Sequence, residues 1–190
     1  ITVTAKTDTK TYDGGVTSGV APEVTSGAWQ PGDSAVLTQT FDTKDVGTNK
    51  TLTPAAAITD GNSGNNYAVT LVTDSTGVIT AKALTVSGIT AQDKVYNADT
   101  DATLNTGSAA LVGVIGSEDV TLNLDLAAGA FASKNVGTAI AVTVSGLALE
   151  GTAKGNYTLT QPATSATITA RPITVTAKTD TKTYDGGVTS

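Results

Sequence analysis

Residues 1–18 read ITVTAKTDTKTYDGGVTS, and residues 173–190 repeat the same letters without a change. An identical segment at two distant points of a chain indicates a tandem repeat. A weaker copy lies between them, since ITVTA at Ile1 returns as LTVSG at Leu84. We therefore predict three segments: a first repeat at residues 1–83, a second repeat at residues 84–172, and the start of a next copy at residues 173–190.

Three motifs recur in the same order in both repeats, which indicates two homologous domains. They are KTYDG (10–14) and KVYNA (94–98), FDTKDVGT (41–48) and FASKNVGT (131–138), and GNNYAVT (64–70) and KGNYTLT (154–160). The two repeats follow each other without a Gly/Ser-rich linker, in the run VITAKALTV (78–86). Adjacent repeats are therefore expected to sit end to end with restricted bending.

These motifs resemble the YDG and MBG repeat domains of large bacterial surface adhesins, many of which are filamentous-haemagglutinin-like proteins. The resemblance covers the whole chain. The second repeat departs from the pattern at Asn97 and Ala98, and the first departs from it at Trp29 and in DGNSGNN (60–66). The resemblance implies a repeated module that is extracellular, on a bacterial cell surface or secreted. It implies no catalysis and identifies no ligand.

Composition excludes several classes of function. The chain has no Cys and no His, which removes thiol nucleophiles, Ser-His-Asp triads and the usual zinc ligands. Eleven Lys and Arg are scattered among seventeen Asp and Glu, with a net charge of −6, so nucleic-acid binding is not expected. No apolar run reaches the roughly 20 residues that span a bilayer. We expect no enzyme activity, no catalytic residues and no cofactor. The chain also lacks Met, which suggests that it is a piece of a longer protein.

Apolar and polar residues alternate along many short segments, such as AVTLV (68–72) and VTLNLDL (120–126), which is typical of half-buried strands. We predict an all-β fold of two tandem immunoglobulin-like β-sandwich modules, followed by the first strands of a third. The alternative is a β-grasp fold in each module. That fold needs a helix, for which residues 54–60 and 108–119 are the candidates.

Every aromatic residue except Trp29 occupies a recurring position. We predict that these residues anchor the core and are mostly buried: Tyr12, Phe41 and Tyr67 in the first repeat, and Tyr96, Phe131 and Tyr157 in the second. Tyr67 and Tyr157 are expected to form tyrosine corners. Trp29 is the candidate for a binding residue.

Two further groups of polar residues have alternative interpretations. Asp60, Asn62 and Asn65 are candidate calcium ligands, but the loop lacks the spacing of a known calcium loop, so we expect a solvated loop and no metal site. The recurring lysines, Lys10 with Lys94 and Lys44 with Lys134, are expected to lay their stems over aromatic rings. The alternative for them is an internal Lys–Asn/Asp isopeptide crosslink.

The leading functional hypothesis is a stalk or spacer of a surface adhesin that projects a distal binding domain. Its partners are the adjacent repeats of the same chain. The alternative is an adhesive module that itself contacts glycan or matrix protein. We expect a monomer in which the tail, residues 173–190, lies against the end of the second repeat. The alternative for the tail is strand exchange with another chain.

Overall fold

The computed structural model describes residues 1–188 of the chain. These residues form β-strands, one short 3-10 helix η1 (Lys154–Asn156) and no α-helix. The all-β prediction is therefore confirmed. The β-grasp alternative lacks the helix it requires, since residues 54–60 and 108–119 contain only strands, turns and irregular segments.

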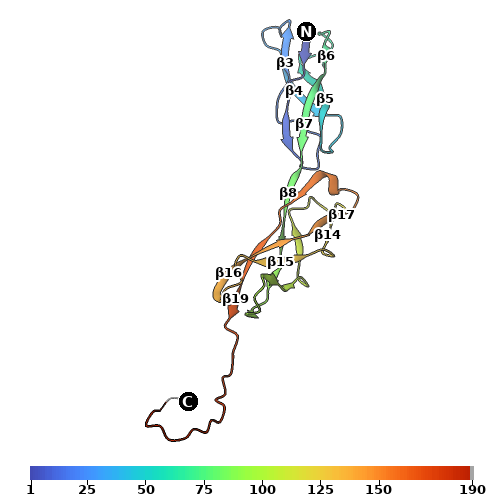
Figure 1. The fold of residues 1–190 in the computed structure, drawn as a ribbon. Coiled ribbons are helices and arrows are strands. Elements are labelled where there is room, and N and C mark those ends of the chain that lie inside the picture. The colour runs from blue at the N-terminus through green and yellow to red at the C-terminus, as the bar shows by residue number, and fades with distance from the viewer. Residues whose placement is uncertain (189–190) are drawn as a thin grey trace.

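The first repeat, blue to green in Figure 1, folds into two sheets. One has the strand order β3-β1-β6 and the other the order β2-β7-β5-β4. Their strands are β1 (Thr2–Thr4), β2 (Thr9–Thr11), β3 (Glu23–Ser26), β4 (Ser34–Phe41), β5 (Gly47–Thr59), β6 (Thr70–Val72) and β7 (Asp74–Thr80).

The second repeat divides the same arrangement among more and shorter strands. A three-stranded sheet has the order β13-β8-β18, a five-stranded sheet has the order β10-β19-β16-β15-β11, and β12-β9 and β14-β17 form pairs. The strands are β8 (Lys82–Ser87), β9 (Thr90–Ala91), β10 (Lys94–Val95), β11 (Asp101–Ala102), β12 (Leu104–Asn105), β13 (Ala110–Val112), β14 (Thr121–Asn123), β15 (Ala128–Phe131), β16 (Gly137–Ser145), β17 (Ala148–Glu150), β18 (Tyr157–Leu159) and β19 (Ala163–Thr169).

In each repeat, strands near the beginning pair in parallel with strands near the end. β1 pairs with β6, and β8 pairs with β18. β2 places Lys10 opposite Ile79 on β7, and β10 places Lys94 opposite Ile168 on β19 in the same way. This differs from the antiparallel sheets of the predicted immunoglobulin-like sandwich. Because its first and last strands run in the same direction, the chain enters each repeat at one end and leaves at the other.

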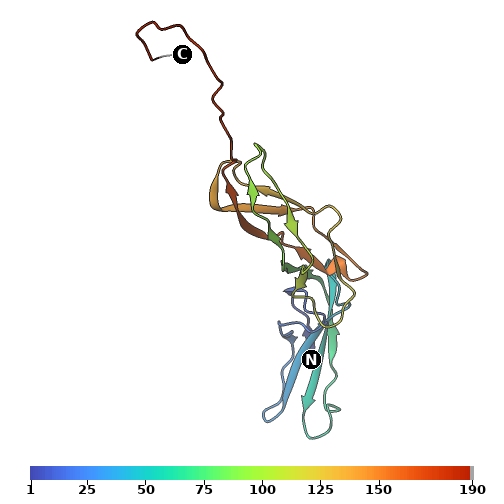
Figure 2. The same ribbon diagram turned by 90° about the horizontal axis from the view of Figure 1, so that it is seen from below.

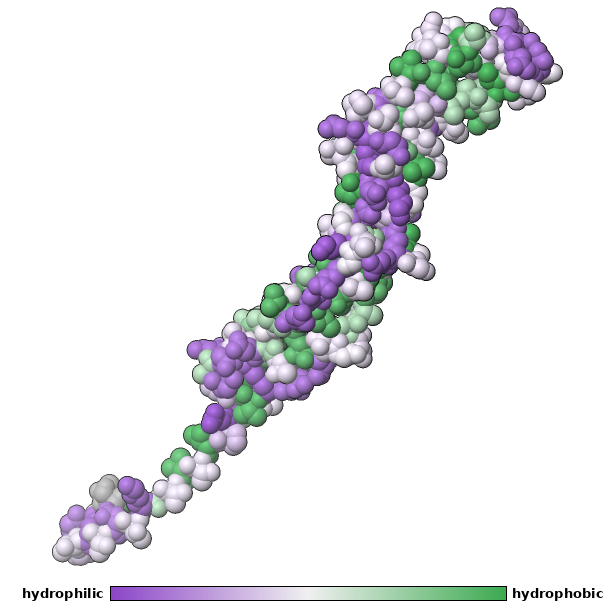
Figure 3. Space-filling view, turned by 90° about the vertical axis from the view of Figure 1, so that its right-hand side faces the viewer, coloured by the Kyte–Doolittle hydropathy of each residue, from purple (hydrophilic) through white to green (hydrophobic). Residues whose placement is uncertain are grey.

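The two repeats consequently lie end to end along one long axis (Figures 1 and 3). β7 passes into β8 with only Ala81 between the two strands. Within residues 1–188, every ladder joins strands on the same side of Ala81. No helix of the described residues is long and apolar enough to cross a membrane.

Two clusters of buried side chains form the core. The larger cluster joins both repeats, because it contains Ala5, Tyr12, Phe41, Leu52 and Ile79 from the first and Leu84, Val120 and Tyr157 from the second. The smaller cluster lies within the second repeat and contains Phe131, Val142, Ala166 and Ile168. The hydrophobic core therefore continues across the boundary between the repeats.

The recurring aromatic residues fall into two groups. Phe41 and Phe131, in equivalent strands, are both buried. Of the four tyrosines, the pair next to the boundary is buried, with Tyr12 1% and Tyr157 6% exposed. Tyr96 and Tyr67 are only half-buried, which corrects the prediction of uniform burial. These two tyrosines lie at the outer ends of the repeat pair, where no neighbouring repeat covers them.

The tail, residues 173–188, forms no strand and leads away from the second repeat (Figures 1 and 2). Its Tyr184 is 93% exposed, although the identical position Tyr12 is buried. The expectation that the tail lies against the second repeat is therefore wrong for these residues, and residues 189–190 lie outside the described chain. The reason is pairing: residues 1–11 pair with β6 and β7, and the tail has no such strands beside it. Strand exchange through the tail stays a prediction.

Candidate functional site at the junction of the two repeats

The junction, where the first repeat contacts the second, is built from the recurring motifs. Tyr12 follows β2, and its backbone N–H donates to the Thr80 carbonyl at 2.8 Å. Lys44 lies in the turn between β4 and β5. From the second repeat come Glu118, in the turn after β13, and Tyr157, the first residue of β18. The YDG and F-x-x-K motifs of one repeat thus meet the GNY motif of the next.

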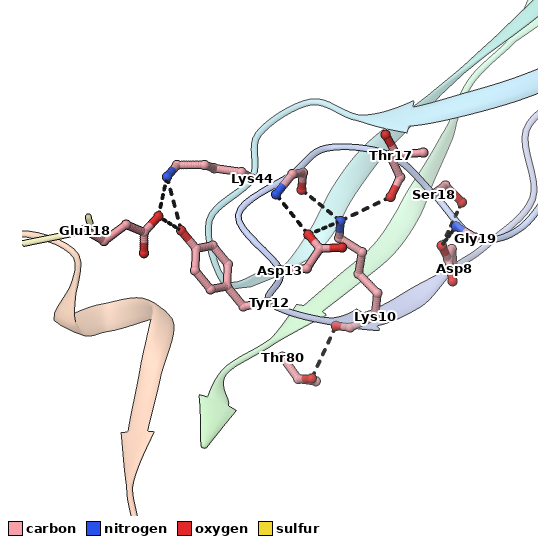
Figure 4. A network of polar contacts seen from close by, with 11 residues as sticks. Asp8, Lys10, Tyr12, Asp13, Thr17, Ser18, Gly19, Lys44, Thr80 and Glu118 are labelled. Atoms are coloured by element: carbon pink, nitrogen blue, oxygen red, sulfur yellow. Dashed lines mark hydrogen bonds and ion pairs between the residues drawn. The ribbon is translucent and has the colours of Figure 1, made fainter. Parts of the chain in front are cut away.

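Glu118 accepts hydrogen bonds from both repeats, and Figure 4 shows those from Tyr12 and Lys44. Its Oε1 accepts a hydrogen bond of 2.5 Å from the Tyr12 hydroxyl and one of 2.7 Å from Lys44 Nζ. Its Oε2 accepts a hydrogen bond of 2.6 Å from the Tyr157 hydroxyl. Lys44 Nζ also lies 3.1 Å from the Tyr12 hydroxyl oxygen. Both carboxylate oxygens are therefore occupied, and each tyrosine is held by the same side chain.

In this network the pKa of Glu118 is lowered and the pKa values of Lys44, Tyr12 and Tyr157 are raised. The hydrogen bonds from Lys44, Tyr12 and Tyr157 lower the pKa of Glu118 to about 2. The hydrogen bond to Glu118 raises the pKa of Lys44. Burial, followed by the hydrogen bond to Glu118, raises the pKa of both tyrosines. At neutral pH the junction therefore holds one anion, one cation and two neutral phenols, a charge-balanced set.

The two tyrosine rings also pack directly on each other. Their centroids are 5.4 Å apart and their planes meet at 81°, the edge-to-face geometry that aromatic pairs prefer. Lys44 Nζ lies 5.8 Å from the centroid of the Tyr12 ring, within the range of a cation–π contact. The junction thus combines an ion pair with buried aromatic area.

Asn156 makes a second bridge between the repeats. Its Oδ1 accepts from the backbone N–H of Val46 at 2.9 Å, and its Nδ2 donates to Asp45 Oδ1 at 3.0 Å. Asn156 closes helix η1 immediately before Tyr157, and its side chain is buried. Because the amide is used once as acceptor and once as donor, it fixes the orientation of the turn at residues 42–46.

The glycine of the YDG motif lies against the second repeat. Gly14 has a φ of +79°, and a Cβ placed on it would be 3.1 Å from Cγ2 of Ile115. Glycine serves this position for two reasons, since it accepts the left-handed conformation and it leaves room for the isoleucine. The equivalent residue of the second repeat, Ala98, has a φ of +74°.

A tyrosine-binding turn positions Glu118. The turn IGSE (115–118) closes with a hydrogen bond from the Glu118 N–H to the Ile115 carbonyl at 3.3 Å. The Ile115 N–H donates to the Tyr157 hydroxyl oxygen at 3.1 Å, and that hydroxyl donates to Glu118. The turn thus supplies one donor and one acceptor to the phenol.

The first repeat has an equivalent tyrosine-binding turn at its outer end. In the turn QPGD (30–33), the Asp33 N–H donates to the Gln30 carbonyl at 3.0 Å. The Gln30 N–H donates to the Tyr67 hydroxyl oxygen at 2.8 Å, and the hydroxyl donates to Asp33 Oδ2 at 2.6 Å. Asp33 is therefore the counterpart of Glu118, an equivalence that the sequence analysis missed because the residue types differ. The prediction of tyrosine corners at Tyr67 and Tyr157 is therefore wrong, because a tyrosine corner bonds to backbone a few residues upstream, whereas these hydroxyls meet backbone N–H groups 37 and 42 residues upstream.

The model of the YDG domain family matches residues 1–76 and again residues 80–166. The chain belongs to the YDG domain family. No curated protein matches it, and no solved structure matches it. The two matches meet at the junction, so each YDG domain contributes one end to it.

The recurring lysine of the YDG motif holds the following loop. Lys10 Nζ donates to Asp13 Oδ1 at 2.7 Å and to the carbonyls of Gly15 and Thr17 (Figure 4). It also lies 5.5 Å from the centroid of the Phe41 ring. The ammonium group of Lys10 therefore lies over the aromatic ring and is also held by the loop. The alternative, an internal Lys–Asn/Asp isopeptide crosslink, stays untested.

Lys94 of the second YDG domain makes the equivalent contacts. Its Nζ donates to Asp99 Oδ1 at 2.6 Å, to the Asp99 carbonyl at 3.0 Å and to the Asp101 carbonyl at 2.9 Å. It lies 5.2 Å from the centroid of the Phe131 ring. This recurrence explains why Lys precedes the tyrosine in both repeats.

Trp29, the candidate binding residue, lies at the outer end of the first YDG domain. It is half-buried and meets the Tyr67 ring edge to face, with centroids 5.1 Å apart at 80°. A shallow pocket of about 270 Å³ lies beside Tyr67, lined also by Ile58, Val69 and Leu71. Trp29 immediately precedes the turn QPGD, as Val114 precedes the turn IGSE in the second domain. Val114 packs against the larger core cluster, which joins both repeats and is called the junction cluster below.

The candidate calcium ligands organise their own loop. The Asp60 carboxylate accepts hydrogen bonds from the backbone N–H groups of Asn62, Gly64 and Asn66, which lower its pKa. Asn65 Nδ2 donates to the Asn62 carbonyl at 2.7 Å. The described residues contain no group of three or more His, Cys, Asp or Glu placed to hold a metal ion. The Asp60 carboxylate thus stabilises the conformation of its own loop.

Proposed function

We propose that this chain is a spacer: a pair of stacked YDG domains from the stalk of a bacterial surface adhesin, extracellular or secreted. Its task is geometric, since the stacked domains hold a distal binding domain away from the surface. The proposal assigns no catalysis to the chain and no partner other than adjacent domains.

One observation carries the proposal, namely that the motifs recurring in both repeats are used at the junction. Tyr12 and Lys44 of one domain bind Glu118 of the next, and the Tyr12–Tyr157 pair is buried. Contacts between flexibly linked domains are usually polar and small. A buried aromatic pair with a shared carboxylate instead favours a stiff connection, which a projecting stalk needs.

The spacer function is tested by replacing the chain within its parent surface protein. We expect an unrelated rigid repeat of similar length to preserve adhesion, and a flexible Gly/Ser linker of equal residue count to reduce it. Adhesion that disappears with the rigid replacement would contradict the spacer and indicate direct binding.

The second candidate function is direct adhesion to glycan through the outer end of the first domain. It is favoured by the half-buried Trp29–Tyr67 pair next to a pocket, because aromatic rings and a few polar groups commonly line ligand sites. A glycan array with the wild-type chain and with Trp29→Ala tests it. Binding that Trp29→Ala abolishes would favour adhesion over the spacer.

A further inference from the structure

The two outer ends of the repeat pair carry the counterparts of the residues that form the two halves of the junction, and no second domain covers them among the described residues. At the outer end of the second domain, Tyr96, Lys134 and Val136 occupy the places of Tyr12, Lys44 and Val46. Val136 is 55% exposed whereas Val46 packs against the junction cluster. Among the described residues Lys134 has no ion pair, whereas Lys44 is paired with Glu118.

The outer end of the first domain is the matching half. Asp33 and Tyr67 occupy the places of Glu118 and Tyr157, and Tyr67 is held by its turn in the same way. Asn66 is exposed whereas its counterpart Asn156 is buried. The uncovered cation of one end thus has an anion as its counterpart on the other end.

The chain leaves the outer end of the second domain with a copy of the segment that opens the first domain. β19 ends at Thr169, and the residues from Ile173 onwards repeat the beginning of the first domain letter for letter. The connecting run TITARPITV (167–175) matches the run VITAKALTV (78–86), which crosses the existing junction. A domain that begins at Ile173 would therefore be delivered with the same spacing as the second domain.

We propose that the outer end of the second domain is a docking surface for a further YDG domain of the first-repeat type, one that begins at Ile173. This inference deepens the spacer proposal and rests on it. In the contact, Lys134 pairs with the Asp33 position, Tyr96 packs on the Tyr67 position, and Ala98 faces the Gln30 position. Trp29 of the incoming domain lies where Val114 lies in the existing junction.

The shorter Asp33 side chain makes this contact different from the existing one. Glu118 uses one oxygen for its own Tyr157 and the other for Tyr12 and Lys44 of the neighbouring domain. Asp33 also gives one oxygen, Oδ2, to its own Tyr67, which leaves Oδ1 for the incoming Lys134. Trp29 is larger than Val114, which occupies the equivalent place in the existing junction. Its additional apolar area offsets the shorter side chain of Asp33.

The test uses a doubled chain, in which residues 19–172 of the same sequence follow residue 190. The tail then becomes the start of a complete second pair of domains. Trp29 is the only tryptophan of the chain, so Trp29→Phe in the first pair leaves one tryptophan at the new contact. The matched control carries Trp29→Phe in the second pair and keeps the tryptophan at the open end.

We expect the tryptophan at the new contact to emit at shorter wavelength than the one at the open end and to resist acrylamide quenching. Lys134→Ala in the first pair should partly reverse both changes, and Lys134→Arg should retain them. Lys134→Ala in the undoubled chain should leave its Tm unchanged. If both tryptophans emit alike and are quenched alike, the two surfaces do not meet and the inference is overturned. That result would leave the spacer proposal standing, because replacement of the repeats tests it separately.

Discussion

Tyr12 and Tyr157 come from different YDG domains and share one carboxylate, that of Glu118, while their rings pack edge to face. Each tyrosine also belongs to its own domain, since Tyr12 packs with the core and Tyr157 is bound by the IGSE turn. The junction therefore couples the two domains through groups that both domains need for their own stability.

Replacing Glu118 should destabilise both domains together. The Glu118 carboxylate accepts hydrogen bonds from three donors, namely the Tyr12 hydroxyl, Lys44 Nζ and the Tyr157 hydroxyl. In Glu118→Gln the amide NH₂ group is itself a donor, so at least one of these hydrogen bonds is lost, together with the ion pair with Lys44. Removing one partner of a buried hydrogen bond costs about 1–3 kcal/mol in the free energy of unfolding. Urea denaturation measures this loss. The matched control, Asp33→Asn at the open end, should cost less, because water reaches Tyr67. Equal losses would contradict the role of the junction.

The contribution of Glu118 should depend on pH in the acidic range. The pKa of Glu118 is about 2 in the folded chain, below its ordinary value of 4.5. The folded state thus favours the ionised form, so the stabilisation is complete above pH 4.5 and is lost as the pH falls towards 2. The difference in free energy of unfolding between wild type and Glu118→Gln should narrow over this interval. A difference that stays constant down to pH 2 would count against the network.

Opposite substitutions at the two equivalent turns should have opposite effects. Gly14→Ala places a methyl group in the left-handed region and against Ile115, so it should destabilise by at least about 1–2 kcal/mol. Ala98→Gly relieves the strain of a φ of +74° and should be neutral or stabilising by up to about 1 kcal/mol. Thermal melts of both variants measure this. A destabilised Ala98→Gly would show that the methyl group makes a contact of its own.

Calcium should leave the stability of the chain unchanged. The Asp60 carboxylate already accepts three backbone N–H groups, so an incoming ion would have to break these bonds. Thermal melts with calcium and with a chelator should give the same Tm. A clear rise with calcium that Asp60→Asn abolishes would identify the loop as a metal site.

The sequence was sufficient to predict the strands and the recurring residues, because alternation and repetition are local patterns. Which repeat a residue touches depends on how the domains stack, so the prediction of uniform burial failed at Tyr67 and Tyr96. Glu118 was missed for a second reason: Asp33 lies 34 residues before its tyrosine, whereas Glu118 lies 39 residues before its own. A change of residue type combined with a change of spacing leaves no repeated pattern to find.

The central claim is that the junction holds the two YDG domains as one rigid body. Residual dipolar couplings, measured by NMR separately for residues 1–80 and 84–169 of the whole chain, test it most directly. We predict that both sets of couplings fit one alignment tensor of the same magnitude and orientation. We also predict that Glu118→Ala makes the two tensors diverge. Two different tensors in the wild-type chain would show that the domains move independently and would contradict the account.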